Sequence, residues 1–240
     1  MNPDLATLAA WTTVDDWPNI PCPVCLRATL TVQAFEDLPT AKSNMLQQTN
    51  DDWEPDWIRG HFRGVLRCHA KRCGEQVLVT GEMEIALAES SSRGGDDYPS
   101  VYLLRFALPA LPLIQFPDGC PDSVRRHVNQ AAALLWADPG AAAGRLRLAI
   151  EQLLTELGVA EKRVLADRIS EFRETREDVA ETLEAVKWIG NQGAHEDTLS
   201  VTDVLDGASL LEHALVLLYS QPKIQALAAQ INANKGIRRP

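Results

Sequence analysis

The fold of the second half of the chain is decided around one segment, Lys187-Trp-Ile-Gly-Asn-Gln-Gly-Ala-His-Glu196. A helix that continues into this segment places Lys187, Asn191 and His195 one turn apart, on a single polar stripe. The neighbouring stripe is expected to be buried and consists of Val179, Leu183, Val186 and Gly190. Glycine costs roughly 1 kcal/mol relative to alanine within a helix, so Gly190 indicates either close packing of another backbone or a local break.

Helical periodicity extends on both sides of this segment, from about residue 122 onwards. Before it, Asp138-Pro139 forms a suitable N-cap and first helical position, and Gly158 is placed to end the same helix. After it, Ser200-x-x-Asp203 is typical of a helix start. Residues 118–240 are therefore expected to form an α-helical bundle.

The first half has the pattern of a small β domain. Short runs rich in β-branched and aromatic residues predict strands over residues 28–35, 61–67, 76–80, 82–87 and 100–108. Four prolines between residues 109 and 121 then interrupt any regular element, so we place the domain boundary between residues 117 and 118. The predicted fold class is α+β, with a small β domain over residues 1–117 and the helical bundle over residues 118–240.

Length and composition restrict the classes of function. The chain has 240 residues, 45% of them hydrophobic, and a formal net charge of −10. An acidic protein does not bind phosphate over its whole surface, so any contact with nucleic acid must be local. No run approaches the ~20 apolar residues of a membrane span, and the N-terminus lacks the pattern of a signal peptide. We therefore expect a cytoplasmic protein without membrane contact.

Four of the five cysteines form two close pairs, Cys22-Pro-Val-Cys25 and Cys68-His-Ala-Lys-Arg-Cys73. Each pair lies just before a predicted strand, and two such turns supply the four thiolates of a tetrahedral structural Zn2+ site. Zinc bound there would staple a β domain whose core is otherwise thin. The alternative is four buried cysteines without metal, and His69 is a lesser candidate ligand. The 42 residues between the pairs exceed the usual zinc-ribbon spacing, so we expect an insertion near residues 43–56.

A local basic cluster surrounds the second cysteine pair in this acidic chain. Its candidate nucleic-acid-binding residues are Arg63, Arg67, Lys71 and Arg72. They could contact phosphate groups. The alternative is that they are solvated side chains of a strand and a turn, because no array of aromatic residues for base stacking accompanies them.

The complete arrangement resembles a bacterial domain family. Its elements are Cys22-Pro-x-Cys25, a second cysteine pair, a proline-rich connection, Ala-Gly-Arg-Leu-Arg-Leu-Ala-Ile-Glu151 and Gly190-Asn-x-Gly-Ala-His195. This order is similar to that of the bacterial domain of unknown function 4145 family, which is found alone or fused to restriction endonuclease subunits, here preceded by a zinc-ribbon-like segment. The helical part of that family is similar to the HEPN superfamily. HEPN proteins are helical bundles that often dimerise, and many are metal-independent ribonucleases of toxin and antiphage systems.

The resemblance also implies candidate catalytic residues. The HEPN active site reads Arg-Asn-x-x-x-His, and Asn191 and His195 match its Asn and His, whereas the Arg position is Gly190. Cleavage of RNA needs a general acid or base, which His195 would supply, and a cation beside the phosphate, which Lys187 or Arg147 would have to supply. The alternative is that Asn191 and His195 satisfy backbone groups at the end of a glycine-broken helix.

Three functions follow from these interpretations. The first is a non-catalytic HEPN-like interaction module of bacterial defence, which binds nucleic acid or a partner protein and forms a homodimer through its bundle. The second is a metal-independent endoribonuclease that uses His195. The third is a purely structural subunit of a restriction-type complex, which by itself would have no affinity for RNA or DNA.

Overall fold

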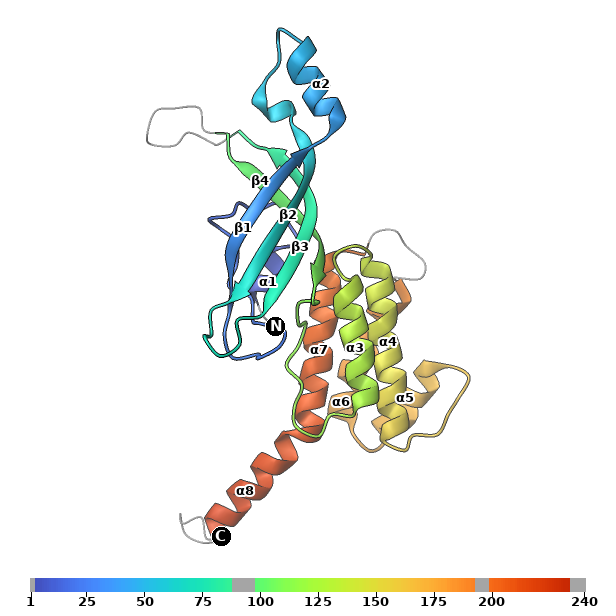
Figure 1. Ribbon diagram of the computed structural model, residues 1–240. Coiled ribbons are helices and arrows are strands. Elements are labelled where there is room, and N and C mark those ends of the chain that lie inside the picture. Colours follow the sequence, from blue (N-terminus) through green and yellow to red (C-terminus); the bar gives the residue numbers. More distant parts are fainter. Residues whose placement is uncertain (1–2, 88–97, 193–198, 234–240) are drawn as a thin grey trace. The chain divides into compact units, whose positions relative to one another are not determined.

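The computed structural model describes residues 3–87, 98–192 and 199–233 of the chain. These residues form two compact units, Asn2–Pro112 and Leu113–Pro240, and the division falls within the proline-rich connection. The first unit contains a β-sheet and the second is helical, so the α+β class is confirmed (Figure 1). We call them the sheet unit and the helical unit. Among the described helices, none has the length and apolarity of a membrane-spanning segment.

The sheet unit is built on four antiparallel strands that neighbour one another in chain order. The strands are β1 (Leu30–Pro39), β2 (Arg59–Cys68), β3 (Gln76–Ile85) and β4 (Ser100–Leu108). Burial alternates along β2 and β3, so one face of the sheet is the core and the other is exposed. The prediction of two strands over residues 76–80 and 82–87 is wrong, because β3 runs through Gly81 without a break.

The buried face is covered by the N-terminal segment, which includes helix α1 (Pro3–Thr7). Trp17 packs edge-to-face on Phe35 with ring centroids 4.9 Å apart, and Phe35 stacks on Phe62 at 5.2 Å. Phe62 is fully buried, as is Leu66 further along the same face of β2. Large aromatic side chains therefore supply much of the hydrophobic core of this small unit.

The insertion expected near residues 43–56 connects β1 to β2 at one end of the sheet. It contains helix α2 (Ala41–Thr49) and a 3-10 turn, η1 (Pro55–Trp57). Thr40 caps α2 by accepting a hydrogen bond from the Ser43 backbone N–H. The buried Ser43 hydroxyl donates to the carbonyl of Arg59 at 2.9 Å, and this bond ties α2 to the start of β2.

The helical unit contains six described helices. They are α3 (Asp122–Leu134), α4 (Pro139–Glu156), α5 (Leu165–Arg173), α6 (Glu177–Gln192), α7 (Val201–Tyr219) and α8 (Gln221–Ala233). The predicted starts of α4 and α7 are confirmed, because Asp138 caps the former and Ser200 and Asp203 form a capping box on the latter. Gly158 follows α4 with a φ of 77°, a conformation that glycine adopts without strain.

The apolar stripe predicted on α6 is buried, and Gly190 explains how closely α6 approaches α4. A Cβ atom at position 190 would lie 2.7 Å from the Cβ of Arg147 and 3.2 Å from the carbonyl oxygen of Ala143, both on α4. Of the two explanations that the sequence allows, close packing of another backbone is therefore the one observed. The same contact leaves no room for an arginine at this position.

This packing predicts opposite effects for two alanine substitutions. Gly190→Ala should lower the free energy of unfolding by about 1–3 kcal/mol, because the new methyl group overpacks the contact with α4. Gly144→Ala on α4 should raise it by up to about 1 kcal/mol, because that position has no atom within 4 Å and alanine favours the helix. Chemical denaturation of both variants measures the difference, and a Gly190→Ala variant as stable as Gly144→Ala would contradict the close approach.

Candidate metal centre and the polar cluster of the helical unit

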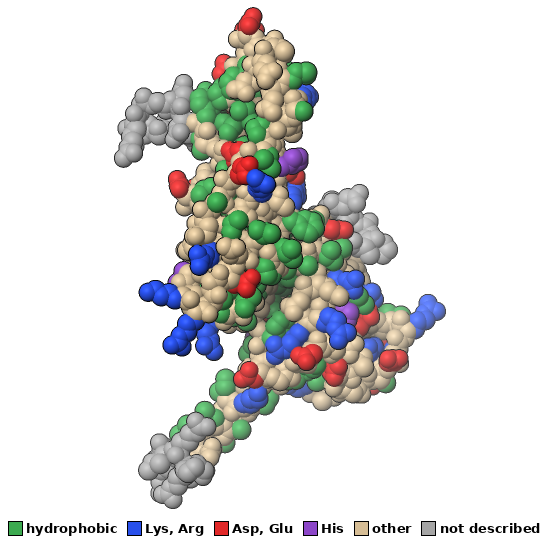
Figure 2. All heavy atoms as spheres, in the orientation of Figure 1, with side chains coloured by type: hydrophobic (Ala, Val, Ile, Leu, Met, Phe, Trp, Pro, Cys, Tyr) green, Lys and Arg blue, Asp and Glu red, His purple; other side chains and the backbone are tan. Residues whose placement is uncertain are grey.

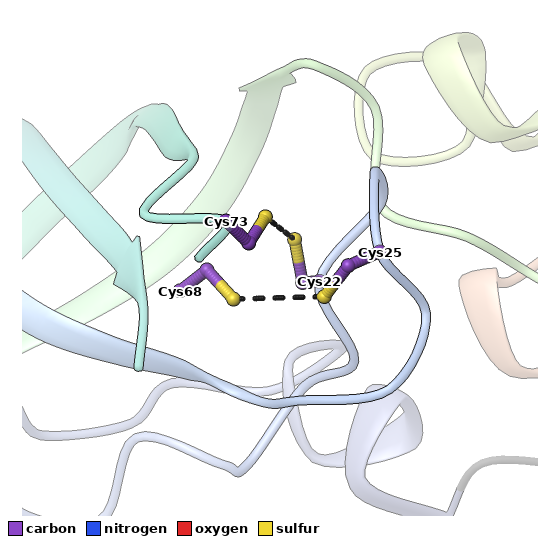
Figure 3. A group of neighbouring side chains, drawn as sticks. All are labelled: Cys22, Cys25, Cys68 and Cys73. Atoms are coloured by element: carbon purple, nitrogen blue, oxygen red, sulfur yellow. Dashed lines mark hydrogen bonds between the residues drawn. The ribbon is translucent and has the colours of Figure 1, made fainter. Parts of the chain in front are cut away.

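The fold brings together the four cysteines predicted to bind metal. The Sγ atoms of Cys22 and Cys73 are 3.8 Å apart, those of Cys25 and Cys68 are 3.7 Å apart, and all four lie within 4.8 Å of one another (Figure 3). These separations are far longer than a disulfide bond of about 2.05 Å, and all four thiols are free. The two turns therefore form one cluster of sulfur atoms.

The same backbone arrangement positions the sulfur atoms in both turns. In the first, the N–H of Cys22 donates to the carbonyl of Ala28 at 2.8 Å, and in the second, the N–H of Cys68 donates to that of Glu75 at 2.8 Å. The residue after the second cysteine has a positive φ in both turns, 53° at Leu26 and 63° at Gly74. A left-handed residue at this point reverses the chain and directs both thiols of each turn to the same side.

The spacing of the sulfurs fits a tetrahedral ion. Metal–sulfur bonds of about 2.3 Å in a tetrahedron place the sulfurs about 3.8 Å apart, as seen for the two closest pairs. Cys22 and Cys68 are buried, whereas Cys25 and Cys73 are half-buried, so an ion here would be closed off from substrates. The donor set is that of a structural metal site rather than a catalytic one, because all four positions are taken by protein ligands.

The thiols differ in how easily they lose a proton. Burial raises the pKa of Cys22 to about 12, whereas the backbone N–H of Arg27 lowers the pKa of Cys25 to about 6. Burial also raises the pKa of Cys68. Several thiolates placed side by side in a buried site repel one another, and a bound cation removes that cost. The cluster is therefore chemically suited to binding a metal ion.

His69 is not part of this sulfur cluster. Its Nδ1 atom lies 3.2 Å from the Oγ1 atom of Thr29 and 3.1 Å from the Thr29 carbonyl oxygen, and the side chain is exposed. The histidine therefore links the second turn to Thr29, the residue before β1. Its Nδ1 atom makes this contact.

Basic side chains gather at the same end of the sheet unit, opposite α2 (Figure 2). The group consists of Arg27, Arg67, Lys71 and Arg72, all exposed, and we call it the basic end. Within the described ranges, none of them forms an ion pair with a carboxylate. Arg27 was not among the residues predicted from the sequence, although its place two residues after Cys25 put it on the first turn.

Arg63, the fourth of the predicted nucleic-acid-binding residues, lies apart from the basic end. It is on the exposed face of β2, where its guanidinium forms an ion pair with Glu36 on β1. Arg63 and Arg67 are four residues apart on one strand, which separates their Cα atoms by about 13 Å. The structure therefore groups Arg67, Lys71 and Arg72 with Arg27 and pairs Arg63 with an acidic residue.

The candidate catalytic residues of the helical unit lie around the contact between α4 and α6. Lys187 is only 5% exposed, and its Nζ is 3.4 Å from Glu184 and 4.2 Å from the centre of the Trp188 ring. Arg147 packs over Gly190 and forms an ion pair with Glu151 at 3.3 Å. Asn191 is half-buried near the end of α6. His195, which the resemblance implies as the acid or base, lies outside the described residues.

Glu184 is a member of this cluster that was not predicted from the sequence. It lies on α6 one turn before Lys187 and also forms an ion pair with Arg173 on α5. A carboxylate shared by two cations fixes the position of Lys187. The signal in the sequence was the i, i+3 spacing of Glu184 and Lys187 on one helix.

Two family models match the chain in succession. Residues 12–107 match the family described as Domain of unknown function (DUF8608), and residues 129–234 match the family described as Domain of unknown function (DUF4145). The helical unit matches DUF4145. The predicted resemblance to that family is thus confirmed for this segment. No curated protein and no solved structure matches the chain.

The two matched segments divide the candidate sites between them. The DUF8608 segment contains all four cysteines and the whole basic end. The DUF4145 segment contains Arg147, Glu184, Lys187 and Gly190, and it also spans the implied His195. The metal cluster and the polar cluster of the helical unit therefore lie in segments that match two different family models.

Replacement of one cysteine ligand should release the metal. We expect about one metal ion per chain in the purified protein, and almost none after Cys22→Ser or Cys73→Ser, because three thiolates leave the tetrahedral site open. The thermal transition of the sheet unit should fall or disappear in these variants. Cys120→Ser is the matched control, since Cys120 lies in the helical unit, and it should keep its metal. Metal analysis by mass spectrometry decides, and full occupancy in Cys22→Ser would contradict the assignment.

Proposed function

We propose that the protein is a zinc-stabilised interaction module that contacts the phosphate backbone of a nucleic acid through its basic end. Zinc is the proposed ion because four thiolates in a tetrahedron are its typical structural donor set. The single observation that carries the proposal is that four exposed cations, Arg27, Arg67, Lys71 and Arg72, gather without carboxylate partners among the described residues. Such a group in a chain of net charge −10 needs an explanation.

The negative charge of the metal site and its surroundings offsets only part of the positive charge of the basic end. A divalent ion bound by four thiolates carries two negative charges, and the half-buried Glu75 of the second turn adds one. The four cations of the basic end exceed these three negative charges. The end of the sheet unit therefore keeps a positive potential, which attracts phosphate at low ionic strength.

The rest of the exposed sheet face does not extend this positive surface. Arg59 forms an ion pair with Glu84 at 3.0 Å, Arg105 with Glu82 at 2.7 Å, and Arg63 with Glu36. In each of these pairs the carboxylate offsets the charge of the arginine and so weakens its attraction for phosphate. The proposed contact is accordingly local, as the acidic composition requires.

Reversal of charge at the basic end should weaken binding in a salt-dependent way. Arg67→Glu with Lys71→Glu should lower the affinity for single-stranded RNA or duplex DNA by at least about tenfold, and should reduce the slope of log K against log salt by about one per lost phosphate contact. Arg63→Ala is the matched control and should bind like the wild type, because its guanidinium is already paired. Fluorescence anisotropy between about 50 and 200 mM salt measures both effects.

Three outcomes of this experiment separate the functions. Loss of affinity in the double variant alone supports the basic end as the contact. Equal loss in Arg63→Ala would place the contact on the sheet face instead. No salt-dependent binding by the wild type would contradict the proposal and favour a purely structural role in a restriction-type complex.

A second candidate function is metal-independent RNA cleavage by the helical unit. One observation favours it: the side chain of Arg147 crosses the position where the HEPN pattern has its arginine, because Gly190 leaves that place open. The buried Lys187 adds a second cation on the same helix as Asn191. The HEPN relationship, the setting in bacterial defence and a homodimer through the bundle belong to this proposal through the resemblance.

RNA cleavage in excess EDTA tests the catalytic proposal. His195→Ala should abolish cleavage and Arg147→Ala should lower the rate by at least about tenfold, because they remove the proton-transfer group and a cation that stabilises the transition state. His213→Ala on α7 is the matched control, since His213 is exposed on another helix, and it should retain full activity. Cleavage that persists in His195→Ala would rule out this site.

A further inference from the structure

The exposed face of the sheet carries an apolar row that crosses all four strands. Strand register places Ala34 of β1 opposite Val65 of β2, Val65 opposite Leu78 of β3, and Leu78 opposite Leu108 of β4. We call these four residues the apolar row. Beside it runs a second cross-strand row, formed by Glu36, Arg63, Thr80 and Phe106. No polar residue interrupts the apolar row from one edge of the sheet to the other.

The large side chains of this face are open to solvent. Leu78 and Phe106 are each 55% exposed and Leu108 is 68% exposed. The two rows line a hollow of about 470 Å³, and Figure 2 shows hydrophobic side chains gathered on this face. Exposed apolar area costs roughly 25 cal/mol per Å² relative to burial, and a contiguous patch rimmed by polar residues marks an interaction surface.

Charge around the hollow restricts what can cover it. Arg63 forms an ion pair with Glu36. Nearer the α2 end of the sheet, Arg59 forms an ion pair with Glu84, and Arg105 forms one with Glu82. These three pairs balance the charge on the α2 side of the row, whereas Arg67, two residues from Val65 on the same face of β2, belongs to the unpaired basic end. The complementary surface is therefore apolar and has no net charge on the α2 side.

The apolar row can pack against the same row of a second copy that runs in the opposite direction. Side-chain size falls along the row, from Leu108 and Leu78 on β4 and β3 to Val65 and Ala34 on β2 and β1. A two-fold axis parallel to the strands reverses the order of the row in a second copy. Leu108 of each copy then meets Ala34 of the other, and Leu78 meets Val65. Large residues face small ones at every position, which is the arrangement that lets two sheets interdigitate.

We propose that this face is the interface of a two-fold dimer in which the sheets of two copies of the chain pack face to face. The graded size of the row selects a second copy over other partners, because an isologous contact requires a self-complementary patch. This dimer is distinct from the homodimer through the bundle that the HEPN resemblance implies, and it does not depend on the proposed nucleic-acid contact.

Complementary charges at the two ends of the row test the pairing. Leu108→Glu and Ala34→Lys should each raise the dimer dissociation constant by at least about tenfold, since each buries an unpaired charge against an apolar residue. An equimolar mixture of the two variants should recover a heterodimer with an affinity close to that of the wild type, because the carboxylate introduced in one copy meets the ammonium group introduced in the other. Analytical ultracentrifugation measures the affinities, and native mass spectrometry identifies the heterodimer.

Controls and contradictory outcomes follow from the same geometry. Leu87→Glu is the matched control, because Leu87 is 61% exposed but lies beyond the end of β3, and it should dimerise like the wild type. Circular dichroism and metal content verify that each variant is folded. A wild-type protein that stays monomeric at about 100 μM would overturn the proposal. So would a dimer that persists in both variants, or a mixture of them that remains monomeric.

Discussion

The convergence of four sulfur atoms from two turns is the constraint on which the sheet unit depends. The first turn enters β1 and the second joins β2 to β3, so the cluster ties three strand ends to one point. The strands leave this point, and the chain returns to it after the α2 insertion. Leu30 pairs with Cys68 in the sheet register, which places the start of β1 next to the end of β2. The long spacing between the cysteine pairs is therefore the length of an antiparallel strand pair with its connection, and it fits a single metal site.

The helical unit depends on a different constraint, the close approach of α4 and α6 at Gly190. The missing side chain lets Arg147 of α4 lie across α6, so an arginine of the neighbouring helix occupies the space that a side chain at position 190 would need. Lys187 is buried beside it and is held by Glu184 and the face of Trp188. The carboxylate and the aromatic face offset part of the cost of removing the ammonium group from water. The packing of the bundle and the proposed chemistry thus involve the same few residues.

Features of the structure that depend on residues close together in the sequence could be predicted from the sequence. The caps at Asp138 and Ser200 and the two cysteine turns are short-range features, and all were predicted. The predicted strands over residues 76–80 and 82–87 left Gly81 out, whereas β3 runs through it and needs a glycine there, because a Cβ would lie 2.0 Å from the carbonyl oxygen of Leu103 on β4.

Other features depend on contacts between distant segments and could not be read from the sequence. The pairing of Arg63 with Glu36, the burial of Lys187 and the apolar row all require the register of strands or the packing of helices. The apolar row in particular contains one residue from each strand, so no window of the sequence displays it. The same holds for the basic end, where Arg27 joins residues that follow it by about forty positions.

X-ray absorption spectroscopy at the metal edge of the purified protein tests directly whether the four cysteines bind zinc. We expect a zinc edge and a first shell of four sulfur atoms at about 2.3 Å, with no nitrogen or oxygen neighbour. A first shell that contains nitrogen or oxygen ligands, or a protein that is folded without bound metal, would contradict it.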